Sequence, residues 1–273
     1  MTNENDLRRH HLRGRVLYAH SVVADLSQKA RHWIEEQRRP LNTVAFNEHG
    51  LVVKELLYNL DGAVSQIGSM KYDQNGNKME LLFRNPRGGL LNSLVCEYDE
   101  RGRLLECVST QAHGLIIKQR CRPLYDPAGK KIEEVWLFED GTPGRKYVYR
   151  YRLTGELAQK LLYKYNDDGT IEEKWSTLYD EKGNVIEAVC FDSQGQTIAG
   201  PTWYRYNDEG DEIEATSCDL RGDVYSTTSY SYDVDVHGNW IKRLEVFKTA
   251  KSGFETRVIT YRTLQYYSLS PLA

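Results

Sequence analysis

Carboxylates recur through this chain at a spacing that could bind cations or basic groups. A glutamate stands four residues after the glycine of many turns, namely Glu80, Glu106, Glu133, Glu173, Glu187 and Glu214. On alternate strands of an antiparallel sheet, such acids would form a row with members roughly 9 to 10 Å apart, two strand spacings. That row could bind cations or a basic partner. We favour ordinary cross-strand ion pairs with residues that precede the tyrosine of other turns, namely Lys71, Lys164, Arg150 or Arg205.

Two acidic turns resemble the start of a calcium-binding loop. They are Asn166–Gly169 and Asp233–Gly238. A calcium loop of that kind needs a bidentate glutamate at its twelfth position, and the twelfth position from Asp233 is Leu244. We therefore predict turn chemistry and no bound metal, because Asp and Asn side chains accept hydrogen bonds from backbone amides two residues on.

Motifs for nucleophilic, zinc-dependent or phosphate chemistry are absent from the sequence: it has no GxSxG, no HExxH and no P-loop. We predict no catalytic residue and no cofactor. The cysteines are odd in number and lack a CxxC spacing: Cys96, Cys107, Cys121, Cys190 and Cys218. They predict buried apolar residues of a reducing compartment, with neither a disulfide framework nor a zinc site.

Aromatic residues are better candidates for a binding surface. The chain has 19 tyrosines and five tryptophans, and pairs such as Tyr147 and Tyr149 stand two residues apart, on one face of a strand. Amphipathic aromatic side chains are typical of protein interfaces and sugar-binding surfaces, although core packing is the commoner role of any single tyrosine. The predicted partner contacts are Tyr149, Tyr204, Tyr230, Trp240 and His237.

Regularly spaced glycines define the elements that position these side chains. Sixteen of the 21 glycines, from Gly50 to Gly253, fall 12 to 16 residues apart, and most end a turn of aromatic, Asp or Asn, two variable residues, Gly. Glycine supplies the positive φ that closes such a turn. The stretches between turns have the length of one strand, and loops this short join antiparallel strands. The sequence therefore predicts an all-β, antiparallel β-meander repeat of about 17 strands.

Apolar residues on both faces of the predicted strands favour a sheet that curls, into a tube, a spiral or an open curved sheet. We divide the chain into an N-terminal tail, strand and capping segment (residues 1–43), a YD-like β-repeat domain (44–262) and a frayed C-terminal tail (263–273).

The N-terminal region departs from the repeat. Residues 14–26 alternate like a strand. Leu26, Ala30, Trp33 and Ile34 then stand at helical spacing. This spacing predicts a short helix within residues 27–39, with Ser27 as its N-cap, that plugs or caps the sheet.

Composition and charge exclude several classes. With 40% hydrophobic and 27% charged residues, the chain is neither disordered nor embedded in a membrane, and no apolar run approaches the ~18 residues of a spanning helix. A net charge of -3 lacks the excess of positive charge that is typical of nucleic-acid-binding proteins. The basic cluster between Arg8 and Arg15 predicts a solvated tail. Since no secretory signal is visible, we predict a cytoplasmic location, with export by a non-classical route as the alternative.

The turns Tyr72–Gly76 and Tyr98–Gly102, followed by Glu80 and Glu106, resemble the bacterial YD-repeat, or RHS-repeat, family. The resemblance covers about residues 44–262. It implies antiparallel strands that wind into a shell, which in large members encloses a toxic C-terminal domain. This chain is similar to short, stand-alone members of the antitoxin-like kind, and the resemblance carries over no catalytic residue.

Together these features predict a non-enzymatic scaffold or binding protein that presents a rigid surface to a protein partner, in a toxin/immunity or secretion context. A carbohydrate or cell-surface binding module is the alternative, and it would display exposed aromatic rows. A hydrolytic enzyme is a further alternative. It would need a pocket in an irregular segment, near His237, Asn239 and Trp240 or at the turn Pro86–Gly89.

Overall fold

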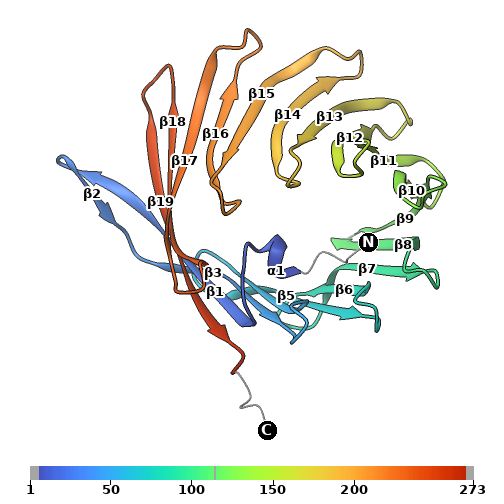
Figure 1. Cartoon of the computed structure of the whole chain (residues 1–273), viewed down its shortest axis with the longest axis horizontal. Coiled ribbons are helices and arrows are strands. Elements are labelled where there is room, and N and C mark those ends of the chain that lie inside the picture. The colour runs from blue at the N-terminus through green and yellow to red at the C-terminus, as the bar shows by residue number, and fades with distance from the viewer. Residues whose placement is uncertain (1–5, 114, 269–273) are drawn as a thin grey trace. The chain divides into compact units, whose positions relative to one another are not determined.

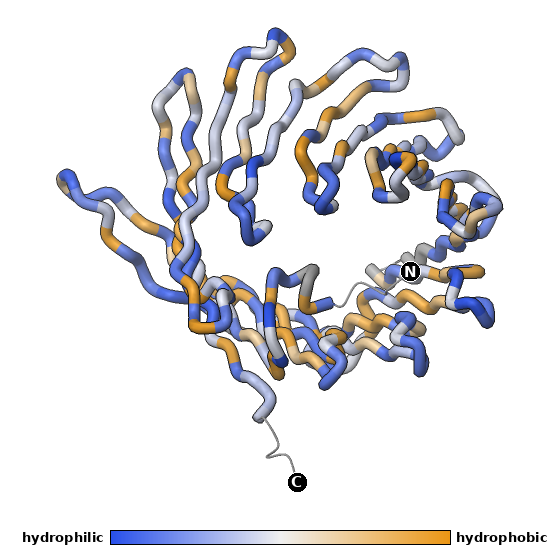
Figure 2. Tube along the Cα trace, in the orientation of Figure 1, coloured by the Kyte–Doolittle hydropathy of each residue, from blue (hydrophilic) through white to orange (hydrophobic). Residues whose placement is uncertain are grey.

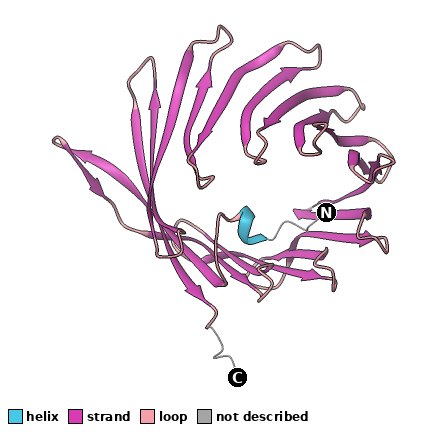
Figure 3. Cartoon of the chain, in the orientation of Figure 1, coloured by secondary structure: helices cyan, strands magenta, loops and turns pink. Residues whose placement is uncertain are grey.

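The structure is a computed structural model that describes residues 6–113 and 115–268. Strands make up almost all of this part of the chain, together with one helical turn, α1 (Asp6–Arg9) (Figures 1 and 3). Its nineteen strands are β1 (Val16–Lys29), β2 (His32–Glu35), β3 (Arg39–Phe46), β4 (Val52–Tyr58), β5 (Val64–Tyr72), β6 (Lys78–Arg84), β7 (Leu90–Tyr98), β8 (Leu104–His113), β9 (Leu115–Tyr125), β10 (Lys131–Phe138), β11 (Pro143–Tyr151), β12 (Leu157–Tyr165), β13 (Ile171–Tyr179), β14 (Val185–Asp192), β15 (Thr197–Tyr206), β16 (Glu212–Cys218), β17 (Val224–Val234), β18 (Trp240–Thr249) and β19 (Glu255–Tyr266).

The strands pack into two units. Unit 1 contains the chain up to Ser93, Tyr230–Val246 and the chain from Thr256 onward, and unit 2 contains Leu94–Ser229 and Phe247–Glu255. In unit 1, β1 pairs with both β19 and β3, and β3 to β6 follow in sequence order. In unit 2, β8 to β17 follow in sequence order. These pairings are antiparallel, so the predicted all-β meander is confirmed, and its curl stays a prediction.

The turns use the predicted chemistry. After β5, the Asp73 Oδ1 accepts the backbone N–H groups of Asn75 and Asn77, both at 2.8 Å, and Gly76 closes the turn with a φ of 79°. Fifteen of the sixteen spaced glycines have positive φ, and the other, Gly114, lies outside the described residues. Hydrophilic residues mark most of these turns (Figure 2).

The register of unit 2 assigns its side chains to two faces. Residues directly opposite each other on neighbouring strands share a face. Trp136, Cys121 and Cys107 are opposite one another in this way and define what we call the Trp136 face. Glu106, the sequence neighbour of Cys107, lies on the other side, the Glu106 face. A buried cluster of Cys96, Cys107, Cys121 and Trp136 forms a core of this unit.

Two cysteines form a disulfide, which contradicts the predicted absence of one. Cys96 on β7 and Cys107 on β8 are bonded, with their Cα atoms 4.2 Å apart. Cys121, Cys190 and Cys218 are free and buried. Sequence spacing missed the bonded pair because a strand, a turn and a second strand bring together residues 11 positions apart, and no cysteine motif marks such a pair.

The N-terminal segment packs into unit 1 and is not a free tail, although its basic residues His11, Arg13 and Arg15 are exposed, as predicted. Leu7 and Leu12 are buried in a cluster that includes Phe46. The buried Asp6 carboxylate accepts a hydrogen bond from the Tyr72 hydroxyl at 2.7 Å. The prediction weighed only the basic residues of this segment, whereas Leu7, just before them, and Leu12, among them, anchor it.

The predicted helix within residues 27–39 is also wrong. β1 continues to Lys29, and β2 returns beside it with Trp33 opposite Gln28. Ala30, with a φ of 56°, lies in the turn between them. The Arg257 guanidinium lies 4.6 Å from the centroid of the Trp33 ring. Strand pairing and this packing override the helical spacing.

The C-terminal boundary of the repeat also differs from the prediction. β19 runs to Tyr266, past the predicted end at residue 262. Residues 269–273 of the predicted tail lie outside the described residues.

Replacing a turn glycine should strain the backbone. Gly183 has a φ of 87°, and no atom lies within 4 Å of where a Cβ would stand. We expect Gly183→Ala to lower the free energy of unfolding by ~1–2 kcal/mol, because an L-residue pays that cost in the left-handed region. Urea denaturation measures it. Lys182→Ala, one residue earlier in the same turn, is the control, and an equal loss there would exclude positive φ as the cause.

Acid should loosen the N-terminal segment through His10. Its ring lies edge-on to Phe46, with centroids 5.4 Å apart. Burial lowers the pKa of His10 below 6.5, Arg262 lowers it further, and Asp6 opposes them. Because the folded pKa lies below the unfolded value, the stabilisation is present above pH 6.5 and is lost as the pH falls toward the folded pKa.

Hydrogen-exchange protection factors of the N-terminal segment should therefore fall below pH 6.5. His10→Gln should remove this pH dependence, whereas His11→Gln, on the exposed neighbour, should preserve it. An unchanged pH profile in His10→Gln would contradict the assignment.

Candidate functional site

A buried carboxylate on β10 organises the aromatic residues of the Trp136 face. Glu134 is 8% exposed. Its Oε1 accepts the indole N–H of Trp136 at 2.7 Å. Its Oε2 accepts hydrogen bonds from the Lys131 ammonium at 2.6 Å and from the Tyr149 hydroxyl at 3.3 Å. One carboxylate thus joins side chains of two neighbouring strands.

The protonation states in this cluster follow from its burial and its charges. Burial raises the pKa of Glu134, but Lys131 and the hydrogen bonds from Trp136 and Tyr149 outweigh it and hold that pKa below its usual value. Burial, reinforced by Glu134, raises the pKa of Tyr149. The same two causes raise the pKa of the Cys121 thiol to about 12. At neutral pH the carboxylate is therefore ionised, and the phenol and the thiol keep their protons.

Cations cover the aromatic rings of the same face. The Lys160 ammonium lies 4.5 Å from the centroid of Tyr147 and 6.0 Å from that of Tyr149. The Arg145 guanidinium lies 4.6 Å from the centroid of Trp136. The register explains both contacts, since Tyr149 is opposite Lys160 and Trp136 is opposite Arg145. Attraction of a cation to a ring face stabilises such pairs.

The other predicted tyrosine contacts lie elsewhere. Tyr204, on β15, is half-buried, and burial raises its pKa. Tyr230 lies in unit 1, where the Arg243 guanidinium is 5.5 Å from the centroid of its ring. Tyr149 is thus the only predicted contact in the Glu134 cluster.

Trp240 and His237 differ from each other in exposure. Trp240 is 7% exposed, and the Arg262 guanidinium lies 3.4 Å from its ring centroid. This ring serves packing within unit 1 and offers little surface to a partner. His237 is exposed, and its ring centroid lies 4.3 Å from that of Tyr266.

Asn239, between His237 and Trp240, holds the N-terminal segment. Its side chain is fully buried. Its Oδ1 accepts the Arg13 backbone N–H at 2.5 Å, and its Nδ2 donates to the Arg13 carbonyl at 2.9 Å and to the Tyr266 hydroxyl at 2.7 Å. The irregular segment suggested for a catalytic pocket therefore makes a structural contact at Asn239.

The repeat glutamates form the predicted ion pairs in three cases. Glu80 pairs with Lys71 at 2.8 Å, Glu173 with Lys164, and Glu214 with Arg205 at 3.2 Å. Arg150 is the exception, since its guanidinium donates to the Gln159 side chain at 2.9 Å.

These acids do not form one continuous row. In unit 2 the register places four of them on the Glu106 face, namely Glu106, Glu133, Glu187 and Glu214. Glu173 is opposite Asp192, five positions from Glu187, and lies on the Trp136 face. The predicted row of acids on alternate strands is therefore wrong at that position, because Glu173 and Glu187 occupy neighbouring strands.

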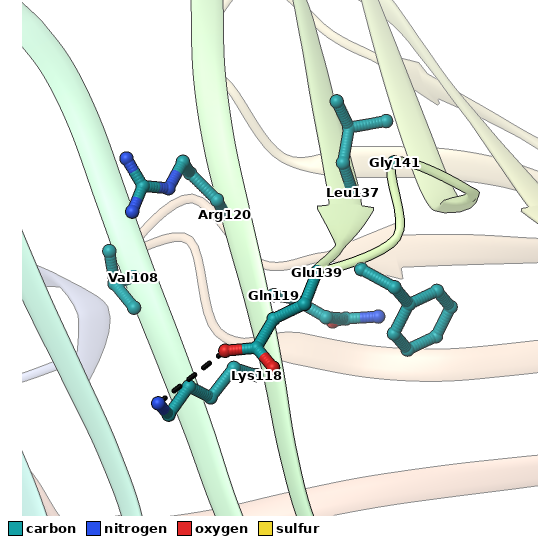
Figure 4. A pocket seen from close by; sticks show the side chains of 8 residues that line it. Val108, Lys118, Gln119, Arg120, Leu137, Glu139 and Gly141 are labelled. Atoms are coloured by element: carbon teal, nitrogen blue, oxygen red, sulfur yellow. Dashed lines mark ion pairs between the residues drawn. The ribbon is translucent and has the colours of Figure 1, made fainter.

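A pocket of about 320 Å³ opens between β8, β9, β10 and the turn after β10 (Figure 4). Val108, Arg120 and Leu137 are opposite one another across these three strands, on the Glu106 face. Lys118 and Glu139 form an ion pair of 3.4 Å on another side. The remaining lining residues are Gln119, Phe138 and Gly141. The pocket thus joins two apolar side chains, Val108 and Leu137, to charged groups that already form ion pairs.

The acidic turns act through their hydrogen bonds, as predicted. Asp168 Oδ1 accepts the Thr170 backbone N–H at 2.9 Å, and Asp235 Oδ1 accepts that of His237 at 2.9 Å. Within the described ranges, no group of three or more His, Cys, Asp or Glu side chains is placed to hold a metal ion. No helix described here has the length and apolarity needed to cross a bilayer.

Comparison with known proteins found only distant likenesses. No family model and no curated protein matches the chain. A porin-like protein from Bacteroides uniformis aligns with a TM-score of 0.45 and 11% identity, over 92% of this chain and 98% of that one. A TcdB2-TccC3 structure aligns with a TM-score of 0.34 and 17% identity, over 88% of this chain and 14% of that one. Likenesses this weak carry no argument about function.

Sequence reasoning missed most of the Glu134 cluster. It singled out Tyr149, but not Glu134, Lys131, Arg145 or Lys160. The available signal was Glu134-Val-Trp136, an acid two residues from a tryptophan on one strand face. The repeats with Glu80, Glu106, Glu187 and Glu214 hold Leu81, Cys107, Ala188 and Ala215 at the position of Glu134.

Glu134→Gln should destabilise unit 2. The substitution removes the charge that balances the buried end of Lys131, and breaking a buried pair in this way costs about 3 kcal/mol. Chemical denaturation measures the loss. Glu139→Gln is the matched control, because Glu139 pairs with Lys118 at an exposed site, where an ion pair contributes less than ~1 kcal/mol. Equal effects of the two variants would contradict the role of Glu134.

Proposed function

We propose that this chain is a non-enzymatic β-repeat protein of the YD-repeat type that presents a rigid surface to a protein partner. The observation that carries the proposal is a group of exposed apolar side chains in unit 2. Their exposed fractions are 65% for Leu220, 46% for Val224, 54% for Tyr225 and 57% for Phe254. Grouped exposed side chains of this kind are typical of interaction sites.

Two contacts hold the group together. The Ala250 backbone N–H donates to the Tyr225 carbonyl at 2.9 Å. The Lys251 ammonium lies 3.9 Å from the Asp219 carboxylate. They place the turn before Phe254 beside the turn that contains Leu220, so a partner would meet one surface that is already ordered. Preorganisation of this kind lowers the entropic cost of binding.

A carbohydrate-binding module remains the alternative, because two indoles are exposed in the same unit. Trp175 is 36% exposed and Trp203 is 42% exposed. Trp175 is opposite Cys190, whereas Trp203 is opposite Glu187, three positions away on β14, so the two rings lie on opposite faces. A sugar chain would need both rings on one face, which favours the protein partner. A toxin/immunity or secretion role in the cytoplasm fits this proposal.

Capture from native cell extract tests the proposal. Immobilised wild-type protein should retain a stoichiometric partner, and Leu220→Ser with Tyr225→Ser should reduce its recovery by about tenfold, because buried aromatic and aliphatic anchors carry most of the binding energy. Mass spectrometry quantifies the retained protein.

Leu153→Ser is the control, since Leu153 is the most exposed large hydrophobic residue described in unit 2 but lies in a different turn. The proposal fails if no stoichiometric partner is retained, or if Leu153→Ser and the double variant lose it equally. A glycan array that binds the wild-type protein would instead favour the carbohydrate alternative.

A further inference from the structure

Cations outnumber carboxylates in the Glu134 cluster. Lys131, Arg145 and Lys160 lie on or beside the rings of the Trp136 face, whereas Glu134 is the one carboxylate that the cluster's hydrogen bonds contain. Lys131 forms the ion pair with Glu134 at 2.6 Å. Within the described part of the chain, neither Arg145 nor Lys160 has a carboxylate within ion-pair distance. The cluster therefore holds two cations whose charge no acid balances.

Both unbalanced cations are partly removed from water. The Arg145 Nε is buried and has no hydrogen-bond partner among the described residues. Burial lowers the pKa of Lys160; Lys131 and Arg145 lower it further, and Glu134 opposes them. Ring contacts offset only part of the cost of desolvating a cation. An anion between the two would remove that cost at both.

The two cations contact rings that belong to the same cluster. Arg145 and Tyr147 are two residues apart on β11, so their side chains stand on the same face about 7 Å apart along the strand. Lys160, from β12, places its ammonium 4.5 Å from the centroid of Tyr147, whereas the Arg145 guanidinium lies against Trp136. The two cations thus lie against neighbouring rings of the same face, Trp136 and Tyr147.

The neighbouring acid on β13 is already paired. Glu173 forms its ion pair with Lys164, which is the residue opposite Arg145. The residue opposite Lys160 on β13 is the neutral Thr177. Among the described residues of β12 and β13, no acid on this face is therefore left to neutralise Lys160.

We propose that the Trp136 face binds a small oxyanion, the carboxylate or phosphate group of a soluble ligand, between Arg145 and Lys160. The guanidinium and the ammonium would donate charge-assisted hydrogen bonds to its oxygens. Both oxygens of Glu134 already accept hydrogen bonds, from Trp136, Lys131 and Tyr149, so that carboxylate has its own partners. The site is distinct from the apolar surface at Leu220 and Tyr225, so it does not depend on the proposed protein partner.

Titration with sodium phosphate and with sodium acetate tests the site. The side-chain NMR signals of Lys160, in protein labelled at lysine, should shift saturably at constant ionic strength maintained with chloride. The pKa of Lys160 should rise when the anion is bound, because the anion favours the charged ammonium. Saturation by phosphate alone indicates a phosphate ligand, and saturation by acetate as well indicates that a carboxylate is accepted.

Matched variants make the test specific. Lys160→Met keeps the length of the side chain and removes its charge, and it should weaken binding by about tenfold, the equivalent of ~1.4 kcal/mol. Lys160→Arg should retain most of the affinity. Lys182→Met, on an exposed turn residue, should bind as the wild type does.

Three results would overturn the proposal. They are equal affinities of Lys160→Met and Lys182→Met, a Lys160 signal that chloride shifts as far as phosphate does, and a Lys160 pKa that no anion changes. Far-UV circular dichroism and hydrogen exchange on Lys160→Met distinguish lost binding from lost folding. If that variant unfolds, the pKa measurement on wild-type protein decides.

Discussion

The other contacts depend on how each turn is closed. An Asp or Asn side chain and a glycine in the left-handed region close it. At these hairpins the ladder shifts by one residue just before the aromatic, as at Lys71/Tyr72, Lys164/Tyr165 and Arg205/Tyr206. The shift puts the preceding cation opposite the glutamate of the next strand. The repeated ion pairs are thus a product of turn geometry, and they contribute little energy of their own because they are exposed.

On β10 the same register has a different result, because this strand carries two consecutive glutamates, Glu133 and Glu134. On β10 the regular glutamate, Glu133, faces one side and Glu134 faces the other, among rings and cations that the ladder places on adjacent strands. Burial makes each of these contacts stronger than its surface equivalents, since few waters compete for the charges. A second glutamate, one position further along the strand, therefore forms a buried polar network on one face while Glu133 keeps its ion pair with Lys146 on the other.

The repeated features of this chain could be predicted from sequence because each depends on residues close together. A turn glycine, its Asp or Asn and the glutamate four positions on need only local geometry, and all three were found. The disulfide, the packed N-terminal segment and the Glu134 cluster depend on residues from several elements, so local patterns missed them. The false helix at residues 27–39 has the same cause: its spacing is helical, but pairing of β1 with β2 decides the structure.

The position of β1 between β3 and β19 has a consequence for biosynthesis. Val16 is opposite Tyr266, so β1 waits for a partner strand that is synthesised much later in the chain. Until then, one edge of β1 is open to pairing with another chain, and a contact of such high sequence separation forms slowly. The buried Asn239, which joins Arg13 to Tyr266, ties the same two regions of the chain. Unit 1 is therefore completed only once β19 has been synthesised, whereas β8 to β17 of unit 2 are consecutive and can pair as they are synthesised.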